Sequence, residues 1–376
     1  MPHQLVHVIT PGDHFSPRTG SAVPTVVDGL SAAGAGGDVV LVARGTYPDR
    51  YASARSVEYP MRRPGSRDRH LDAVSALVGL PRRRARASYR AALGPQHDLP
   101  SAVMLAHNAV QAVPEVDTRR HQVVLYAHNE LFRSYGRAEL RRTLGKSVGT
   151  IAVSSTLAER LRDRLPPGLG RVAVVRNGVD TEVFFPDPEW RRGDRLQVMF
   201  VGRTVPEKGP DVLARAVRRL RRTDVEVTFV GSAGFDPSAA PTSFERELRH
   251  ELDPLGPRAH VVPFQDRNTL PRLLRGADVV VVPSVWAEPS GLTVLEGMAS
   301  GAALVASAVG GIPEQVGDAG VLVPPGDERA LAEVIEHLAD DERALRTARE
   351  SARTHALDHT WHRARAELDE AIADLL

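Results

Sequence analysis

The chain has 376 residues, a formal net charge of +1 at pH 7 and no cysteine. Its length exceeds what one hydrophobic core usually holds and therefore predicts two domains of roughly 180 residues each. The lack of cysteine excludes disulfides and thiolate metal sites. The near-neutral charge, without a recognisable binding module, argues against nucleic-acid binding.

The apolar runs of this chain are short. None approaches the roughly 18 to 20 residues that a membrane-spanning helix needs. The first run, at 5–9, is long enough only for a strand, and the residues before it lack the basic opening of a signal peptide. We therefore expect a cytoplasmic protein without a membrane span.

Short apolar runs alternate with helical patterns along both halves of the chain, which predicts α/β domains with doubly wound sheets. In the first half the expected strands are 5–9, 38–42, 102–106, 123–127, 150–153 and 172–175. In the second half they are 196–201, 225–230, 260–262, 279–282, 303–307 and 321–323. The charged, proline-bearing segment 184–195 between the halves is typical of a linker.

Positive charge is concentrated in the first half. Residues 1–188 hold 25 basic against 17 acidic residues, and ten arginines lie between positions 55 and 90. One interpretation is a patch for an anionic acceptor or a lipid headgroup, with peripheral membrane contact. We favour a solvated arginine-rich surface, because the segment lacks the aromatic and leucine face of an interfacial helix.

Two histidines follow strands of the first half. His107 follows 102–106 and His128 follows 123–127, and each is succeeded by an asparagine. Ligands of open α/β sheets bind at the carboxyl ends of the strands, where both histidines are expected. Either histidine can bind a ligand there or serve as a structural histidine with satisfied hydrogen bonds.

A polar loop follows the expected strand 196–201. Gly202, Arg203 and Lys208 lie in it, just before a helical pattern that begins at 212. Only two residues of this chain are lysines, so the one at 208 points to a specific need for a compact cation, although a solvated loop charge is the alternative. Fixed cations at this edge would neutralise a diphosphate.

The most informative segment is 279–301. Four valines end at a proline, Glu288 lies in the turn that follows, and a helix starting near 289–290 carries Glu296. Backbone N–H groups at a helix start attract phosphate, whereas carboxylates accept hydrogen bonds from sugar hydroxyls. The combination suits a nucleotide sugar, although first-turn acids and solvated helix glutamates are common.

Three motifs carry a family resemblance: Gly-Arg-x-x-x-Glu-Lys-Gly at 202–209, Glu-x7-Glu at 288–296, and Gly-Gly-Ile-Pro-Glu-Gln-Val at 310–316. Their order and spacing resemble the retaining glycosyltransferases of family 4. The resemblance implies the GT-B fold, with two Rossmann-like domains facing a central crevice and a C-terminal helix crossing back to the first domain. The expected acceptor domain is 1–186 with 360–376, and the expected donor domain is 187–359.

The resemblance also implies roles for individual residues. Arg203 and Lys208 would hold the diphosphate and stabilise its charge as it leaves, while Glu288 would orient the donor sugar. The other implied donor contacts are Gly20, Gly202, Ser290, Gly291, Leu292, Thr293 and Glu296, with His128 beside the reacting carbon. We also expect acceptor contacts from His107, Asn129 and Glu130. The chain has no Asp-x-Asp motif, and we expect neither a metal nor a further cofactor.

The sequence therefore predicts a retaining transferase that moves a sugar from a nucleoside diphosphate sugar, with UDP as the expected nucleotide. The acceptor would be a hydroxyl of a small hydrophilic natural product, a glycan or a glycolipid. A nucleotide-sugar epimerase of the same shape and a non-catalytic sugar-nucleotide-binding protein are the alternatives. The oligomeric state is left open.

Overall fold

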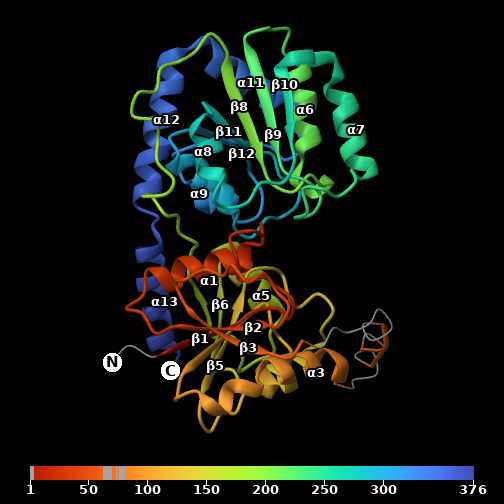
Figure 1. The fold of residues 1–376 in the computed structure, drawn as a ribbon, viewed down its shortest axis with the longest axis vertical. Coiled ribbons are helices and arrows are strands. Elements are labelled where there is room, and N and C mark those ends of the chain that lie inside the picture. The colour runs from red at the N-terminus through yellow and green to blue at the C-terminus, as the bar shows by residue number, and fades with distance from the viewer. Residues whose placement is uncertain (1–3, 62–69, 73, 76–80) are drawn as a thin grey trace. The chain divides into compact units, whose positions relative to one another are not determined.

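The computed structural model describes residues 4–61, 70–72, 74–75 and 81–376 (Figure 1). It divides into two compact units. The first contains Met1–Asn177 together with Trp361–Leu376, and the second contains Gly178–Thr360. The expected boundary at 186 falls inside the second unit, because Val179 and Phe184 belong to its apolar core.

The first unit is built on a parallel sheet of seven strands in the order β3-β2-β1-β4-β5-β6-β7. Its strands are β1 (Leu5–Val8), β2 (Val39–Ala43), β3 (Arg55–Tyr59), β4 (Val103–His107), β5 (Gln122–Ala127), β6 (Gly149–Ala152) and β7 (Val172–Val174). Strands β1, β2 and β4 are buried throughout, as expected for largely apolar strands of a parallel sheet. β3 was not predicted, because only one of its five residues is buried and its sequence mixes charged with apolar residues.

The described helices of the first unit include the C-terminal segment. Its α-helices include α1 (Ala22–Ala32), α3 (Arg83–Ala92), α4 (Arg137–Leu144), α5 (Ser155–Arg164) and α13 (Trp361–Leu375). A Cβ at Gly29 would overlap the Trp361 ring, so glycine lets α1 and α13 approach closely. Arg365 of α13 donates to the Leu30 carbonyl and to Asp38. The predicted return of the C-terminal helix to the first domain is confirmed.

The second unit repeats the architecture with a six-stranded parallel sheet in the order β10-β9-β8-β11-β12-β13. The strands are β8 (Leu196–Val201), β9 (Val225–Val230), β10 (Ala259–Val262), β11 (Val279–Val282), β12 (Ala303–Ser307) and β13 (Val321–Val323). The α-helices are α6 (Pro210–Arg219), α7 (Ser243–Leu252), α8 (Leu270–Arg275), α9 (Leu292–Ala299), α10 (Ile312–Val316), α11 (Glu328–Asp340) and α12 (Glu342–Leu357). Two parallel Rossmann-like sheets are the GT-B class that the sequence predicted.

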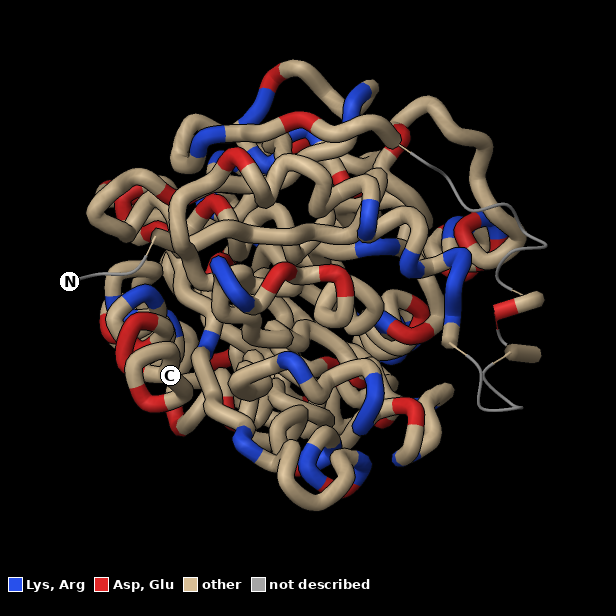
Figure 2. The backbone as a smooth tube through the Cα atoms, turned by 90° about the horizontal axis from the view of Figure 1, so that it is seen from below, with Lys and Arg blue, Asp and Glu red and all other residues tan. Residues whose placement is uncertain are grey.

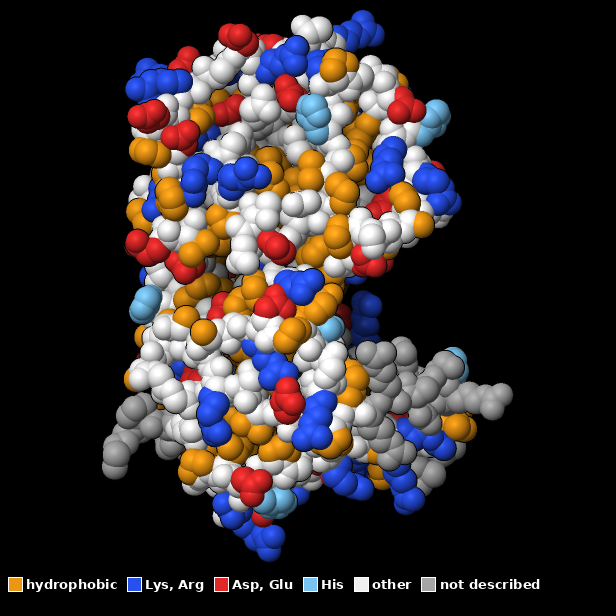
Figure 3. Space-filling model, in the orientation of Figure 1, with side chains coloured by type: hydrophobic (Ala, Val, Ile, Leu, Met, Phe, Trp, Pro, Cys, Tyr) orange, Lys and Arg blue, Asp and Glu red, His pale blue; other side chains and the backbone are white. Residues whose placement is uncertain are grey.

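The arginine-rich segment 55–90 lies partly outside the described residues, since 62–69, 73 and 76–80 are not described. Several of its described arginines contact other side chains: Arg82 binds Glu139, Arg86 binds Gln111, and Arg90 binds Glu115. Basic and acidic residues are interspersed along the backbone (Figure 2). On the face shown in Figure 3, blue and red side chains also lie next to one another at several places.

Candidate functional site

Lys208 is held at the start of α6 by a tight turn after β8. It ends a short 3₁₀ helix, Pro206–Lys208, and Gly209 follows in the left-handed conformation with φ of 66°. A Cβ at Gly209 would overlap the Pro283 carbonyl, so glycine is required both for the turn and for the approach to the end of β11. The turn therefore brings the lysine to the loop that carries Glu288.

Glu288 and Lys208 form a direct ion pair. The Lys208 ammonium lies 2.6 Å and 2.5 Å from the two carboxylate oxygens of Glu288. Ser284 Oγ and Trp286 Nε1 donate to the same carboxylate at 3.1 Å and 3.2 Å. Because Glu288 is buried, these donors offset the cost of removing its charge from water. The cation and the acid that the sequence singled out thus belong to one cluster.

The loop after β12 fixes the backbone of Glu288. The Gly311 N–H donates to the Glu288 carbonyl at 2.7 Å. Gly310 has φ of 63°, and a Cβ there would lie 2.6 Å from the Glu288 nitrogen and closer still to its carbonyl oxygen. Both glycines of the motif at 310–316 are therefore placed against Glu288, which explains their presence in physical terms.

Glu296 lies on α9 and pairs with a cation that the sequence did not single out. Arg267 Nη2 lies 2.5 Å from Glu296 Oε1, and Glu296 is buried. Helix α9 begins at Leu292, somewhat later than predicted, with Gly291 as its N-cap. The Gly291 N–H donates to the Gln315 side chain at 3.1 Å, so in this structure Gln315 occupies one of the expected backbone donors.

The remaining donor residues lie around the same strand ends. Gly202 directly follows β8, and Arg203 is exposed, so a ligand can reach its guanidinium. Thr293 is in the first turn of α9 and donates through its hydroxyl to the Val201 carbonyl at 3.3 Å. Backbone N–H groups in a first helical turn have no partner within the helix and remain available to an anion. The second unit thus gathers cations, carboxylates and backbone donors at one edge of its sheet.

His128 of the first unit follows β5 and is 8% exposed. Its Nε2 lies 2.8 Å from Nδ1 of His107. Burial, with a smaller contribution from the repulsion that a protonated His7 would exert, lowers the pKa of His128 to about 3, so the ring is neutral near pH 7. Its backbone N–H donates to the Asn108 side chain at 2.7 Å, and Asn108 itself has a positive φ of 52°. Asn108 therefore positions His128, and that role was missed in the sequence.

The residues predicted to contact the acceptor differ in how accessible they are. His107 is fully buried and both of its ring nitrogens face other histidines, so its expected contact with an acceptor is wrong for this conformation. Burial, then the repulsion that protonated His128 or His7 would exert, lowers the pKa of His107 well below its usual value. Asn129 is exposed, and Glu130 contacts Arg133 at 3.3 Å. Gly20 is exposed one residue before the N-cap of α1.

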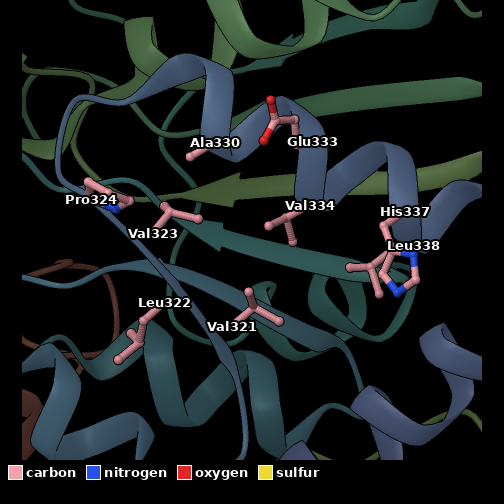
Figure 4. A pocket seen from close by; sticks show the side chains of 9 residues that line it. All are labelled: Val321, Leu322, Val323, Pro324, Ala330, Glu333, Val334, His337 and Leu338. Atoms are coloured by element: carbon pink, nitrogen blue, oxygen red, sulfur yellow. The ribbon is translucent and has the colours of Figure 1, made fainter.

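The second unit also contains a hollow of about 350 Å³ beside β13 and α11 (Figure 4). It is lined by Val321, Leu322, Val323, Pro324, Ala330, Glu333, Val334, His337 and Leu338. Most of this lining is apolar and it includes no lysine or arginine, so it does not suit a diphosphate.

Within the described ranges, no helix combines the length and apolar character that crossing a bilayer demands. The described residues also contain no group of three or more His, Cys, Asp or Glu side chains that could bind a metal ion.

Solved structures match the fold of this chain over nearly its whole length. An Anabaena protein, HepE, in complex with UDP and glucose aligns with a TM-score of 0.71 at 18% identity, covering 99% of both chains. Sucrose-phosphate synthase from Thermosynechococcus elongatus aligns with a TM-score of 0.75 at 20% identity, also covering 99% of both chains. At 18% and 20% sequence identity, this structural similarity establishes the fold alone.

Two curated relatives show sequence similarity. The D-inositol 3-phosphate glycosyltransferase of Salinispora arenicola is 36% identical over 238 residues, which is 57% of this chain and 52% of that protein. That of Mycobacteroides abscessus is 37% identical over 177 residues, 45% of this chain and 39% of that protein. The chain thus matches about half the length of these relatives, or less.

Two family models match successive parts of the chain. The model described as Glycosyltransferase Family 4 matches residues 23–183, and the model described as Glycosyl transferases group 1 matches residues 195–341. The first match lies almost entirely in the first unit and the second lies in the second unit. The chain belongs to the family 4, group 1 glycosyltransferases with the GT-B fold.

Proposed function

We propose that this protein transfers a glycosyl group from a nucleoside diphosphate sugar to an acceptor hydroxyl, with retention at the anomeric carbon. The bond between that carbon and the diphosphate oxygen breaks, and a bond to the acceptor oxygen forms on the same face of the sugar. The proton of the acceptor hydroxyl goes to the departing phosphate oxygen. A UDP-sugar is the proposed donor, since the HepE structure that aligns with this chain contains UDP and glucose.

The observation that carries this proposal is the cluster formed by Lys208 and Glu288 at the carboxyl edge of the second sheet. A diphosphate arriving there would compete with Glu288 for the lysine ammonium. Once the ammonium contacts the diphosphate, the Glu288 carboxylate can accept from sugar hydroxyls while Ser284 and Trp286 still hold it. The charge that develops on the leaving diphosphate is then stabilised by fixed cations.

The proposed acceptor is a small hydroxylated molecule. The names of the relatives and structural neighbours contain inositol 3-phosphate, sucrose phosphate and trehalose phosphate. The trehalose-phosphate synthase of Burkholderia xenovorans is in complex with glucose-6-phosphate. Inositol 3-phosphate and glucose 6-phosphate are therefore the first acceptors to assay. We further propose that the reaction needs no metal, because Arg203 and Lys208 supply positive charge for the diphosphate.

A binding experiment tests the donor assignment before the acceptor is known. A panel of nucleotides and nucleotide sugars is added to the protein and its melting temperature is followed, because a ligand that binds only the folded state must raise it. Incubation with donor alone then separates transfer from epimerisation, since an epimerase changes the sugar without an acceptor. A panel that gives no shift at any concentration would contradict the proposed function.

We expect the two glutamates to affect different ligands. Glu296→Ala should weaken binding of both free UDP and the UDP-sugar by about 10- to 100-fold, because charge-assisted hydrogen bonds to the ribose are lost. Glu288→Ala should leave the affinity for free UDP unchanged or raise it, because Lys208 is no longer neutralised, while the preference for the sugar-bearing donor is lost. Titration calorimetry with both ligands measures the difference.

The matched control for these variants is Glu333→Ala, which removes an exposed glutamate of the same unit whose ion-pair partner among the described residues is an exposed arginine, Arg329. This variant should bind both ligands as the unaltered protein does. Equal losses of UDP affinity in Glu288→Ala and Glu296→Ala would show that the two roles are wrongly divided.

A further inference from the structure

Three histidines form a continuous buried chain in the first unit. His7 lies on β1, His107 ends β4 and His128 follows β5, and these three strands are neighbours in the sheet. His7 Nδ1 lies 2.9 Å from His107 Nε2, and His107 Nδ1 lies 2.8 Å from His128 Nε2. Each nitrogen-to-nitrogen contact needs one proton, so one ring must donate and the other must accept.

An acidic group lies at the inner end of this chain. Asp38 Oδ2 is 3.6 Å from His7 Nε2, and both side chains are buried. The guanidinium of Arg365 donates to the same oxygen at 2.6 Å. Burial would raise the pKa of Asp38, but His7 and Arg365 hold it below its usual value, so the carboxylate is ionised and has no proton to give.

We infer that the carboxylate of Asp38 orients all three histidines in one direction, so that each ring carries its proton on Nε2 and His128 presents an unprotonated Nδ1 to a sugar hydroxyl. In the buried environment, an anion at this distance favours a proton rather than a lone pair on His7 Nε2. His7 Nδ1 then accepts from His107 Nε2–H, and His107 Nδ1 accepts from His128 Nε2–H. This inference rests on the proposed function, because it names the atom through which His128 acts.

The outer end of the chain is accessible. Nδ1 of His128 has no hydrogen-bond partner among the described residues and is not one of their buried, unpartnered atoms. It can therefore accept from a hydroxyl of a bound substrate and cannot donate to one. His107, His7 and Asp38 are positioning residues, since they act on the substrate only through His128.

The hydroxyl of Ser31 is the group that could place the protons of the three histidines on Nδ1 instead of Nε2. Ser31 Oγ lies 3.4 Å from His7 Nε2. If its hydroxyl donated there, every proton in the chain would move to Nδ1 and His128 would present a donor. Ser31 is neutral, whereas Asp38 carries a full charge in a buried site, so the carboxylate dominates. Ser31→Ala should accordingly leave the protonation pattern unchanged.

Nitrogen NMR of the protein labelled in its histidines tests the orientation directly, because the two neutral forms of imidazole have different ring nitrogen shifts. The His128 signals are assigned by their loss in His128→Asn. We expect the Nε2–H form at neutral pH in the substrate-free protein, and an Nδ1–H form would overturn the inference. Asp38→Asn should convert this spectrum into a mixture of both forms, while a spectrum identical to that of the unaltered protein would also overturn it.

Kinetics tests whether the orientation matters to transfer. Asp38→Asn and His7→Phe should each lower kcat by about 10-fold or more, as wrongly protonated histidines do, with no change in UDP affinity. The control is His121→Phe, which removes another buried histidine of this unit, one whose ring, within the described part of the chain, bonds only to the Gln96 carbonyl. An equal loss of kcat in His121→Phe would reduce the effect to stability and contradict the positioning role. The NMR result needs no substrate, so a failed orientation is distinguishable from a failed transferase assignment.

Discussion

Replacing Lys208 by alanine is expected to lower turnover by about 100-fold or more, and Arg203→Ala should have an effect of the same order. Each change removes a cation that neutralises the departing diphosphate. Loss of one group that stabilises transition-state charge typically lowers turnover by about 100-fold or more. The folded state should survive, because Arg203 is exposed and Lys208 lies at a loop end. Steady-state assays of product formation and a thermal melt of each variant measure both effects.

The structure adds a second consequence for Lys208. Its removal leaves the buried Glu288 carboxylate without its cation. The double variant Lys208→Ala with Glu288→Gln removes the cation together with the carboxylate charge that would otherwise stay buried and unpaired. Comparing it with Lys208→Ala therefore separates the loss of the cation from the cost of the unpaired charge. Lys146→Ala is the control, since Lys146 is the other lysine of the chain and its ammonium donates, among the residues that the structure describes, only to the carbonyls of Pro114 and Val116. Near-normal turnover in both single-cation variants would contradict the diphosphate assignment.

The second large effect is expected for Gly310→Ala. The new Cβ would overlap the backbone of Glu288, so either the glycine loop or Glu288 must move. A displacement of about 1 Å at a positioned group can cost about 100-fold in rate, and we expect a loss of turnover of that size. A lower melting temperature should accompany it, because alanine is strained at a φ of 63°.

Gly326→Ala isolates the role of the contact. Gly326 has a similar φ of 78°, but a Cβ there would meet nothing within 4 Å. This variant carries the same backbone strain without the collision and should lose some stability while keeping its turnover. If Gly310→Ala also kept normal turnover, the placement of Glu288 by the glycine loop would be refuted.

Much of the fold was predictable from the sequence because most strands are short, mainly apolar runs. Val279–Val282, for example, is buried throughout, as four consecutive valines predicted. The edge strand Arg55–Tyr59 was missed because it lacks such a run. The start of α9 was placed too early because Pro289 and Ser290 are good helix starters, whereas the structure begins the helix after Gly291.

Individual residues of the candidate site could be predicted from the sequence, but the contacts between them could not. Lys208 and Glu288 were both singled out, but their ion pair joins positions 80 residues apart, which no local pattern reveals. The same holds for Arg267 with Glu296 and for His7 with His107. His107 was expected to face a ligand because it ends a strand, as His128 does. Its full burial depends on neighbouring strands that flank it on both sides.

The central claim, retaining transfer from a nucleotide sugar, is tested most directly by the configuration of the product. The protein is incubated with the UDP-sugar that stabilises it best and with inositol 3-phosphate or glucose 6-phosphate, in excess chelator. The proton coupling at the anomeric carbon of the purified product is then compared with that of the donor. We expect the donor's configuration to be kept and the reaction to proceed without added metal. An inverted product, or activity that chelator abolishes and magnesium or manganese restores, would contradict the account.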